Sequence, residues 1–263
     1  MLDFSNKIFS ELLKKLLESK YKFETFFQHC TFDNSSEKVI LRHDVDRSPL
    51  NSVKIARIEY SHGIKGTYYF RIVNKSYNLN IMTTIAELGH EIGYHYEDVD
   101  LVLSNNKELR TKDQEQIIDA AFESFCKNLE LFRQNFDIKT ICMHGSPLSK
   151  HNNTIIWQKY NYRDLGIIGE PYVDLNFNEF AYLTDTGRRW NGDKFSLRDK
   201  VKSKYNFNFK STQDIIDGIE RLPDKVMFTI HPQRWHDNPM LWLKELFSQN
   251  VKNQIKRIII SRM

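Results

Sequence analysis

Short apolar runs alternate with helically spaced apolar residues along most of the chain. Runs rich in β-branched and aromatic residues predict strands at residues 39–47, 66–73, 90–96, 140–144, 182–186, 226–231 and 257–260. Apolar residues that recur every three or four positions predict helices at residues 5–20, 50–60, 81–88, 111–136, 212–222 and 240–256, with Ser5 and Thr212 as N-caps. Residues 21–32 are aromatic but irregular, so no regular element is expected there.

This alternation predicts an α/β fold with a parallel sheet, because parallel strands are joined by crossover connections that bury both faces. The residues best suited to bind a metal or transfer a proton share one placement, at the carboxyl end of a strand-like run. They are Asp44, Asp46, His95, His144, Asp185 and His231. Sites in α/β proteins are built at that edge of the sheet, and we therefore expect one site to collect these side chains.

The stretch V-I-L-R-H-D-V-D-R, residues 39–47, carries two carboxylates at the end of a buried strand. Residues two apart share a face of a strand, so Asp44 and Asp46 should point the same way and His43 the other way. Two neighbouring buried carboxylates repel each other unless a cation or a shared proton lies between them. A metal or proton site is one interpretation, and an acidic pair that caps and closes a loop is the other.

Histidines are more often structural than functional, and His29, His62 and His151 fit that interpretation. His90 and His95 are five residues apart, so they lie on opposite faces of an extended segment. His95 is nearer the strand end and is followed by Glu97 and Asp98. A neutral imidazole with carboxylates nearby suits zinc or another divalent transition metal.

Composition narrows the class of protein. The 263 residues are 40% hydrophobic and 27% charged, as in soluble globular proteins, and suffice for one large domain or two small ones. No apolar run is long enough to span a membrane, and the N-terminal stretch contains acids and lacks the features of a signal peptide, so we expect a cytoplasmic protein. Three widely spaced cysteines, Cys30, Cys126 and Cys142, argue against a disulfide framework and a zinc ribbon.

The net charge of +4 and pI near 8.8 come from Lys and Arg residues spread along the chain. Such residues usually form a solvated surface, and they form no stripe that indicates nucleic-acid binding. A mildly basic surface also favours an anionic substrate such as a nucleotide sugar. The chain has no G-x-S-x-G elbow, phosphate-binding P-loop or dinucleotide glycine motif. The oligomeric state leaves no signal in the sequence.

Four motifs in this order resemble the polysaccharide deacetylases of the NodB-homology group, which are carbohydrate esterase 4-like enzymes. They are L-R-H-D-V-D, G-H-E-I-G-Y-H-Y, M-H-G-S-P and T-I-H-P-Q-R-W. The resemblance covers residues 39–235 and is nearest to the intracellular subgroup associated with surface-glycan genes. It implies a distorted (β/α)7-type barrel, with residues 1–263 as a single domain and residues 1–38 as an N-terminal helical extension.

The resemblance also implies roles for the motif residues. Asp44 matches the general base, Asp46 a metal ligand and His231 the general acid. His95 matches the first histidine ligand, but Val99 stands at the usual second histidine position. The possible replacements are His144, which we rank first, and Glu97 or Asp98. His144 has an alternative role, to brace Asp44, because the family normally has an arginine in that motif.

The expected substrate is an acetylated sugar, nucleotide sugar or glycan, and the expected cofactor is zinc, with cobalt, nickel or manganese as alternatives. A bound metal would lower the pKa of water to about 7. Sugars stack on aromatic faces, although each aromatic residue is more often core. The pocket candidates are Tyr69, Asp185, Arg188, Trp190 and Trp235, of which Asp185 and Trp190 match a segment that orients the acid histidine or lines the pocket.

The sequence therefore predicts a metal-dependent hydrolase that removes an acetyl group during surface-polysaccharide biosynthesis. Two alternatives remain open at this point. Val99 at a ligand position favours an inactive deacetylase-like module that binds glycans. The same barrel also hosts hydrolases of other C–N bonds, such as cyclic amides.

Overall fold

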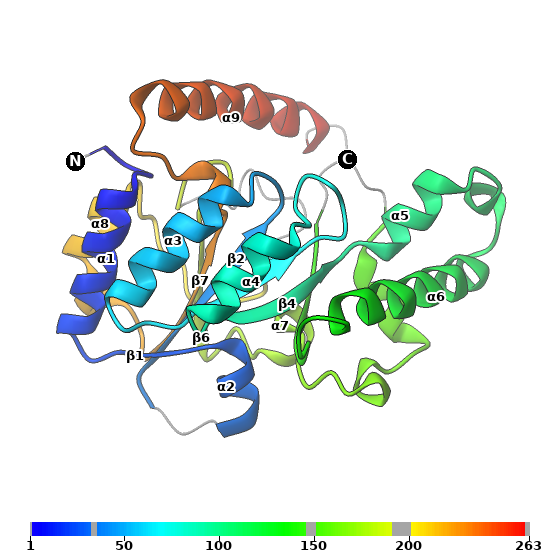
Figure 1. Ribbon diagram of the computed structural model, residues 1–263. Helices are drawn as coiled ribbons and strands as arrows, with labels where there is room; N and C mark the ends of the chain where they lie inside the picture. The colour runs from blue at the N-terminus through cyan, green and yellow to red at the C-terminus, as the bar shows by residue number, and fades with distance from the viewer. Residues whose placement is uncertain (1, 33–35, 146–150, 191–200, 261–263) are drawn as a thin grey trace.

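A seven-stranded parallel sheet forms the centre of the molecule in the computed structural model, which describes residues 2–32, 36–145, 151–190 and 201–260 (Figure 1). The strands follow the path β5-β4-β3-β2-β7-β6, and β1 pairs with the first half of β2. Every strand pair is parallel. The strands are β1 (Lys22–Glu24), β2 (Lys38–Val45), β3 (Thr67–Phe70), β4 (Glu91–Tyr96), β5 (Ile141–Met143), β6 (Phe180–Thr184) and β7 (Lys225–Ile230).

The sheet is strongly curved. Neighbouring strands lie about 4.8 Å apart, so the ends of β5 and β2, three strands apart on the path, would lie roughly 14 Å apart in a flat sheet. His144 follows β5 and Asp46 follows β2, yet Nε2 of His144 lies 3.5 Å from Oδ1 of Asp46. No pairing in the described part of the chain joins β5 to β6. The predicted α/β fold of the distorted-barrel type is thus confirmed, as a barrel that is not closed.

The longer helices that flank the sheet are α1 (Asn6–Glu18), α3 (Leu50–Ser61), α4 (Leu79–Glu87), α5 (Asp98–Asn105), α6 (Gln114–Arg133) and α9 (Pro239–Ile260). Shorter ones are α2 (Phe26–Phe32), α7 (Pro171–Asp174) and α8 (Thr212–Asp217). Ser5 caps α1 as expected, because its hydroxyl accepts a hydrogen bond from the N–H of Ile8. Helix α1 packs against α3 and α8. No helix among the described residues is both long and apolar enough to cross a membrane.

Strand β2 is buried on both faces, and the two faces belong to different clusters. Val39, Leu41 and Val45 pack in the larger cluster with the helices. Ile40 points inward and packs with a smaller cluster that includes Tyr69, Cys142 and Met227. Because side chains alternate along a strand, Arg42 and Asp44 follow Ile40 on the inner face. His43 lies on the outer face, where its Nε2 is 2.6 Å from Oε1 of Glu59 on α3.

Several expected elements differ from the structure. Residues 21–32, expected to be irregular, form β1 and α2, so the N-terminal extension adds a strand to the sheet. Residues 257–260, expected as a strand, continue α9, because no glycine or proline interrupts the helix after Pro239. Ser211, not Thr212, caps α8. Helix α5 was not predicted, and β6 begins and ends two residues before the predicted strand.

Candidate active site

Asp46 lies at the centre of a cluster at the carboxyl edge of the sheet. Its Oδ1 is 3.6 Å from Nε2 of His95 and 3.5 Å from Nε2 of His144. Its Oδ2 is 3.9 Å from Nε2 of His231 and accepts a hydrogen bond of 3.1 Å from the side-chain amide of Gln233. The ends of β2, β4, β5 and β7 therefore deliver one carboxylate and three imidazoles to one place, as the shared strand-end placement predicts.

His95 is held in one orientation by the neighbouring strand. Its Nδ1 lies 2.9 Å from the carbonyl oxygen of Cys142 on β5, an arrangement in which Nδ1–H donates. The other nitrogen, Nε2, faces Asp46. Gly93, two residues earlier on β4, lets the Tyr69 ring of β3 pack close to the strand, because a Cβ there would lie 2.4 Å from that ring. This close approach requires the second glycine of G-H-E-I-G-Y-H-Y.

His144 is oriented by a carboxylate behind it. Its Nδ1 is 2.9 Å from Oε2 of Glu97, so Nε2 is directed at Asp46. Arg71 holds Glu97 in turn through two hydrogen bonds of 2.8 and 2.7 Å. Burial alone would raise the pKa of Glu97, but His144 and Arg71 outweigh it and lower that pKa to about 2. Glu97 is therefore an anion that fixes the imidazole, an arrangement common behind metal-bound histidines.

Asp44 forms a buried, bidentate ion pair with Arg42. Nε of Arg42 donates to Oδ1 at 2.9 Å, and Nη2 donates to Oδ2 at 2.6 Å. Burial disfavours the charged carboxylate, but the guanidinium outweighs it and holds the pKa of Asp44 well below its usual range. Arg42 therefore braces Asp44, and the alternative in which His144 does so is not what the structure has.

His231 is held by Asp185, which follows β6. Its Nδ1 lies 2.6 Å from Oδ1 of Asp185, and its backbone N–H donates to Oδ2 at 2.9 Å. Arg234 and the indole N–H of Trp235 donate to the same carboxylate at 2.6 and 2.7 Å. Burial opposes ionisation of Asp185, but Arg234 and His231 outweigh it and lower its pKa. Nε2 of His231 is left facing the cluster, where it can exchange a proton.

The cluster of Asp46, His95 and His144 fits a divalent transition metal. The ligand-type atoms of the three residues all lie within 4.8 Å of one another. Ligands about 2.0–2.1 Å from a tetrahedral zinc ion lie roughly 3.3 Å apart, close to the separations of 3.5 and 3.6 Å that Asp46 makes. Oδ1 of Asp46 is buried and has no hydrogen-bond partner. A buried acceptor without a donor is unfavourable, and a cation would satisfy it.

The other candidate ligands lie elsewhere. Asp98 accepts hydrogen bonds of 2.7 Å from Tyr94 on β4 and from Ser124 and Asn128 on α6. Val99 is buried in the larger apolar cluster, so its lack of a ligand atom does not affect the cluster around Asp46. A second group, Asp44, His95 and Cys142, also meets the distance criterion for metal ligands, but all three residues are buried and Arg42 already neutralises Asp44.

Most of the expected pocket residues are not at an open surface. Trp190 is buried against Phe4 and donates its indole N–H to Thr212. Arg188 is buried and packs over the rings of Phe4 and Trp242. Both side chains are buried against Phe4, which precedes α1, and their assignment to a substrate pocket stays a prediction.

The other three pocket candidates are buried beside the cluster. Trp235 is buried and contacts Asp185. Tyr69 is buried and hydrogen-bonds to Thr140, with its ring centroid 6.5 Å from that of His95. Asp185 is buried as well, and it orients His231 as the motif match implied.

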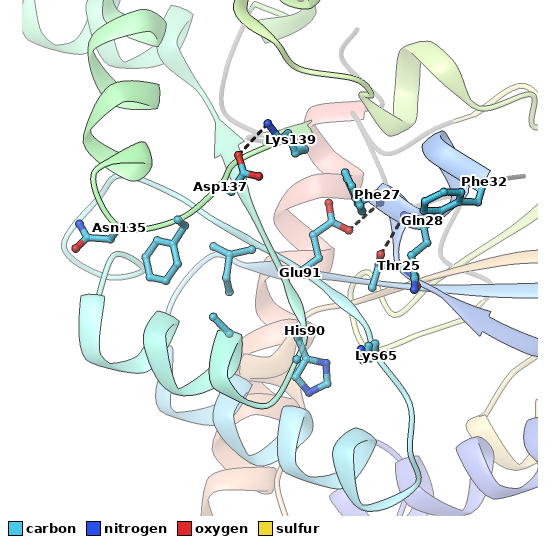
Figure 2. Close-up of a pocket in the computed structure, with 14 residues that line it drawn as sticks. Thr25, Phe27, Gln28, Phe32, Lys65, His90, Glu91, Asn135, Asp137 and Lys139 are labelled. Atoms are coloured by element: carbon cyan, nitrogen blue, oxygen red, sulfur yellow. Dashed lines mark hydrogen bonds and ion pairs between the residues drawn. The ribbon is translucent and has the colours of Figure 1, made fainter.

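Among the cavities lined by described residues, two lie near the sheet. One, of about 420 Å³, is lined by Met143 at the end of β5 and by Asn152, Tyr172, Asn176 and Lys202 among others. The hydroxyl of Tyr172 accepts a hydrogen bond of 2.8 Å from Arg42, which connects this cavity to the Asp44 ion pair. The other, of about 530 Å³, contains Glu91, the first residue of β4, and thus lies at the opposite edge of the sheet (Figure 2).

The sequence reasoning missed Arg42, Arg71 and Gln233. Arg42 carried a usable signal, since it is two residues before Asp44 and therefore shares its face of the strand. Arg71 and Gln233 carried no such sequence signal, because their contacts with Glu97 and Asp46 join segments that are distant in sequence.

No protein-family model matches the chain, and no curated protein matches it. Among solved structures, the chain is similar to the crystal structure of the Xyl-CE4 domain of a multidomain xylanase from the hindgut metagenome of Trinervitermes trinervoides. The identity is 14% and the TM-score 0.40, over 83% of this chain and 84% of that one. The parallel strand pairing, not this distant likeness, establishes the α/β fold.

Proposed function

We propose that this protein is a metal-dependent hydrolase that removes an acetyl group from an N- or O-acetylated sugar or glycan precursor. The observation that carries the proposal is the convergence of Asp46, His95 and His144, with ligand-type atoms within 4.8 Å of one another, beside the buried Arg42–Asp44 pair. Many hydrolytic zinc sites have two imidazoles and one carboxylate as protein ligands and leave a fourth position to water or substrate.

Asp46, His95 and His144 would hold the metal, most favourably zinc, with cobalt, nickel or manganese as alternatives. When bound, such a cation supplies Lewis acidity, which lowers the pKa of water and polarises a carbonyl group. Glu97 and the carbonyl of Cys142 would keep the two imidazoles aimed at the metal, since they contact the other nitrogen of each ring.

Asp44 and His231 would move the protons. Asp44 is ionised at neutral pH because Arg42 lowers its pKa. Arg42 donates one hydrogen bond to each Oδ atom, and the remaining lone pairs of the carboxylate would accept the proton from water. His231 presents Nε2 to the cluster while Asp185 holds Nδ1, so a proton on Nε2 could pass to the leaving amine or alcohol. Asp185 would stabilise the imidazolium that precedes this transfer.

The sugar part of the proposal rests on the four motifs and on the polarity of the neighbouring cavity. Asn152, Thr154, Asn176 and Lys202 line it together with the Tyr172 ring. Amide groups, a hydroxyl, a cation and an aromatic face are groups that bind hydroxylated rings. Placement in surface-polysaccharide biosynthesis is part of the same proposal.

The decisive experiment measures acetate release and metal content on the same preparations. The purified protein is given acetylated sugar nucleotides and acetylated oligosaccharides with zinc, cobalt, nickel or manganese. We expect Asp46→Ala to lose the metal and the activity together, and Asp44→Asn to keep the metal while its kcat falls by roughly 10²- to 10⁴-fold, the range of a general base. Glu108→Gln, at an exposed carboxylate, is the matched control.

Other results would assign the protein differently. Full activity of Asp44→Asn or His231→Ala would refute the roles given to these residues. A metal-free protein that binds sugars without releasing acetate would identify an inactive glycan-binding module. A protein that binds metal and hydrolyses cyclic amides but not acetylated sugars would identify a different C–N hydrolase.

A further inference from the structure

The outward face of α9 is unusually apolar. Six of its side chains are large, hydrophobic and exposed. They are Met240, Leu241, Leu243, Phe247, Val251 and Ile255, with exposed fractions between 45% and 78%. Residues spaced by three and four positions lie on one side of a helix, so Met240, Leu243, Phe247, Val251 and Ile255 form one continuous stripe. Contiguous exposed apolar surface of this kind marks an interaction site.

The inward face of α9 has polar residues at its fully buried positions, beside the half-buried Trp242 ring that packs against Arg188. Its buried residues are Glu245, Gln249 and Asn253. Glu245 forms an ion pair of 2.9 Å with Arg47, one residue after Asp46, and Asn253 donates to the carbonyl of Gly187 at 3.0 Å. Helix α9 is thereby attached to the loops after β2 and β6, and it lies along the top of the molecule in Figure 1. The apolar stripe points away from these anchors.

The charges on α9 have one sign on the exposed side. Among the side chains of α9 that the structure describes, the exposed charged residues are Lys244 and Lys252. The acid, Glu245, is buried and neutralised by Arg47. Lys244 lies within the stripe, four residues after Met240 and three before Phe247, and Lys252 lies beside it. Exposed apolar residues with lysines among and beside them are found on helices that lie in the interface of an anionic membrane, where the lysine stems lie along the apolar layer and the ammonium groups reach the headgroups.

We propose that α9 docks this protein on the surface of an anionic lipid bilayer, with the apolar stripe inserted among the headgroups. A second copy of the chain fits less well. Two α9 helices packed on each other would bring lysines together without an exposed acid to pair them. The stripe also has five residues, whereas a stable interface uses about 20–30 residues a side. In this arrangement α9 would lie between the bilayer and the carboxyl ends of the strands.

The test is sedimentation of the purified full chain with vesicles of equal parts phosphatidylglycerol and phosphatidylcholine. We expect binding that weakens as salt is added, because lysines contribute, and weaker binding to pure phosphatidylcholine. Phe247→Glu should bind these vesicles at least about tenfold more weakly, since no aromatic ring then enters the apolar layer. Phe32→Glu is the matched control, because Phe32 is 59% exposed on α2, at the opposite end of the molecule from α9 (Figure 1).

Two further measurements keep the result unambiguous. Circular dichroism checks that Phe247→Glu is folded, and hydrolysis of a soluble acetylated sugar should be unchanged, because Phe247 points away from the cluster. Loss of activity without loss of binding would therefore concern the proposed reaction alone. Absence of vesicle binding by the unaltered protein overturns the docking proposal. So does an equal effect of the two substitutions, or a dimer that Phe247→Glu dissociates in a protein that does not bind vesicles.

Discussion

At the scale of single residues, the Arg42–Asp44 pair decides the charge state of the proposed base. Both side chains are almost fully buried, and a buried carboxylate without a partner would tend to be protonated. The guanidinium reverses this tendency, so the folded protein has an Asp44 pKa below its unfolded value of about 3.9. The pair therefore stabilises the fold above that pH, and this stabilisation is lost as the pH falls through the folded pKa.

Replacement of Arg42 tests this dependence. We expect Arg42→Met to raise the pKa of Asp44, so the acidic limb of the kcat/KM–pH profile should move to higher pH. The uncompensated carboxylate should also lower the free energy of unfolding by roughly 3–5 kcal/mol. Both effects are measurable by pH–rate profiles and urea unfolding. Arg163→Met, which removes a half-exposed partner of Asp174, is the control, and an unchanged acidic limb in Arg42→Met would contradict the assigned role.

Residue-scale prediction from sequence succeeded where chemistry and strand alternation acted together. Asp44 and Asp46 both face His95, His43 lies on the other side of the strand, and His144 lies beside Asp46, while its ranking as a metal ligand stays a prediction. The burial of Trp190 was not anticipated. Trp190 follows a strand end as a pocket residue would, but Phe4 and Thr212 enclose it, and no local pattern predicts contacts with segments so distant in sequence.

At the scale of elements, the junction of β4, α5 and α6 depends on Asp98. Burial raises the pKa of this carboxyl to about 6, although three hydrogen bonds, from Tyr94, Ser124 and Asn128, act in the opposite direction. The folded protein therefore binds a proton at Asp98 more tightly than the unfolded chain does. Ionisation of Asp98 weakens the attachment of α5 and α6, so its contribution to stability falls as the pH rises from about 4 to 6.

An amide at this position should remove that pH dependence. We expect the free energy of unfolding of the unaltered protein to fall relative to that of Asp98→Asn by roughly 3 kcal/mol between pH 4 and pH 7, at about 1.4 kcal/mol per pKa unit. Denaturant unfolding at several pH values provides the comparison, with Asp137→Asn as an exposed control. Parallel stability curves for the unaltered protein and Asp98→Asn would rule out a raised pKa at Asp98.

Element prediction depended on length. Long helices such as α1 and α6 show several periods of pattern and were found, whereas β1 has three residues and α5 has eight, too few for periodicity to separate them from irregular structure. Length was not the only factor, since β5 and α8 are as short and were predicted. The end of α9 was wrong for another reason. Residues 257–260 have strand propensity, but a helix without a breaker continues through them, since propensity is weaker than context.

At the scale of the whole molecule, curvature of the sheet assembles the site, and a bound metal should stabilise that assembly. A ligand that binds the folded state alone adds about 2.7 kcal/mol at a hundredfold excess over its Kd. We expect zinc to raise Tm by several degrees, and the rise should vanish with EDTA or in His144→Ala. Differential scanning calorimetry measures the shift. An equal shift in the unaltered protein and in His144→Ala would show that zinc binds elsewhere.

The curvature itself was inaccessible to sequence reasoning. Alternating elements indicate a parallel sheet, and the resemblance indicates a barrel, but the strand order β5-β4-β3-β2-β7-β6 and the separation of β5 from β6 depend on long-range packing. The convergence of His144 on Asp46 could be expected from their strand ends and measured only in three dimensions. Cytoplasmic location stays a prediction.

The position of Arg42 on the same strand as Asp44 has a consequence for engineering and for divergence. The cation that fixes the base is encoded two codons away from it, so no insertion or deletion in a loop can separate them. The other residues of the cluster come from segments distant in sequence, so their positions relative to Asp44 change when those segments move. A protein designer could therefore graft residues 42–44 into another parallel strand and carry the charged pair with it as a portable unit, with the metal ligands supplied anew.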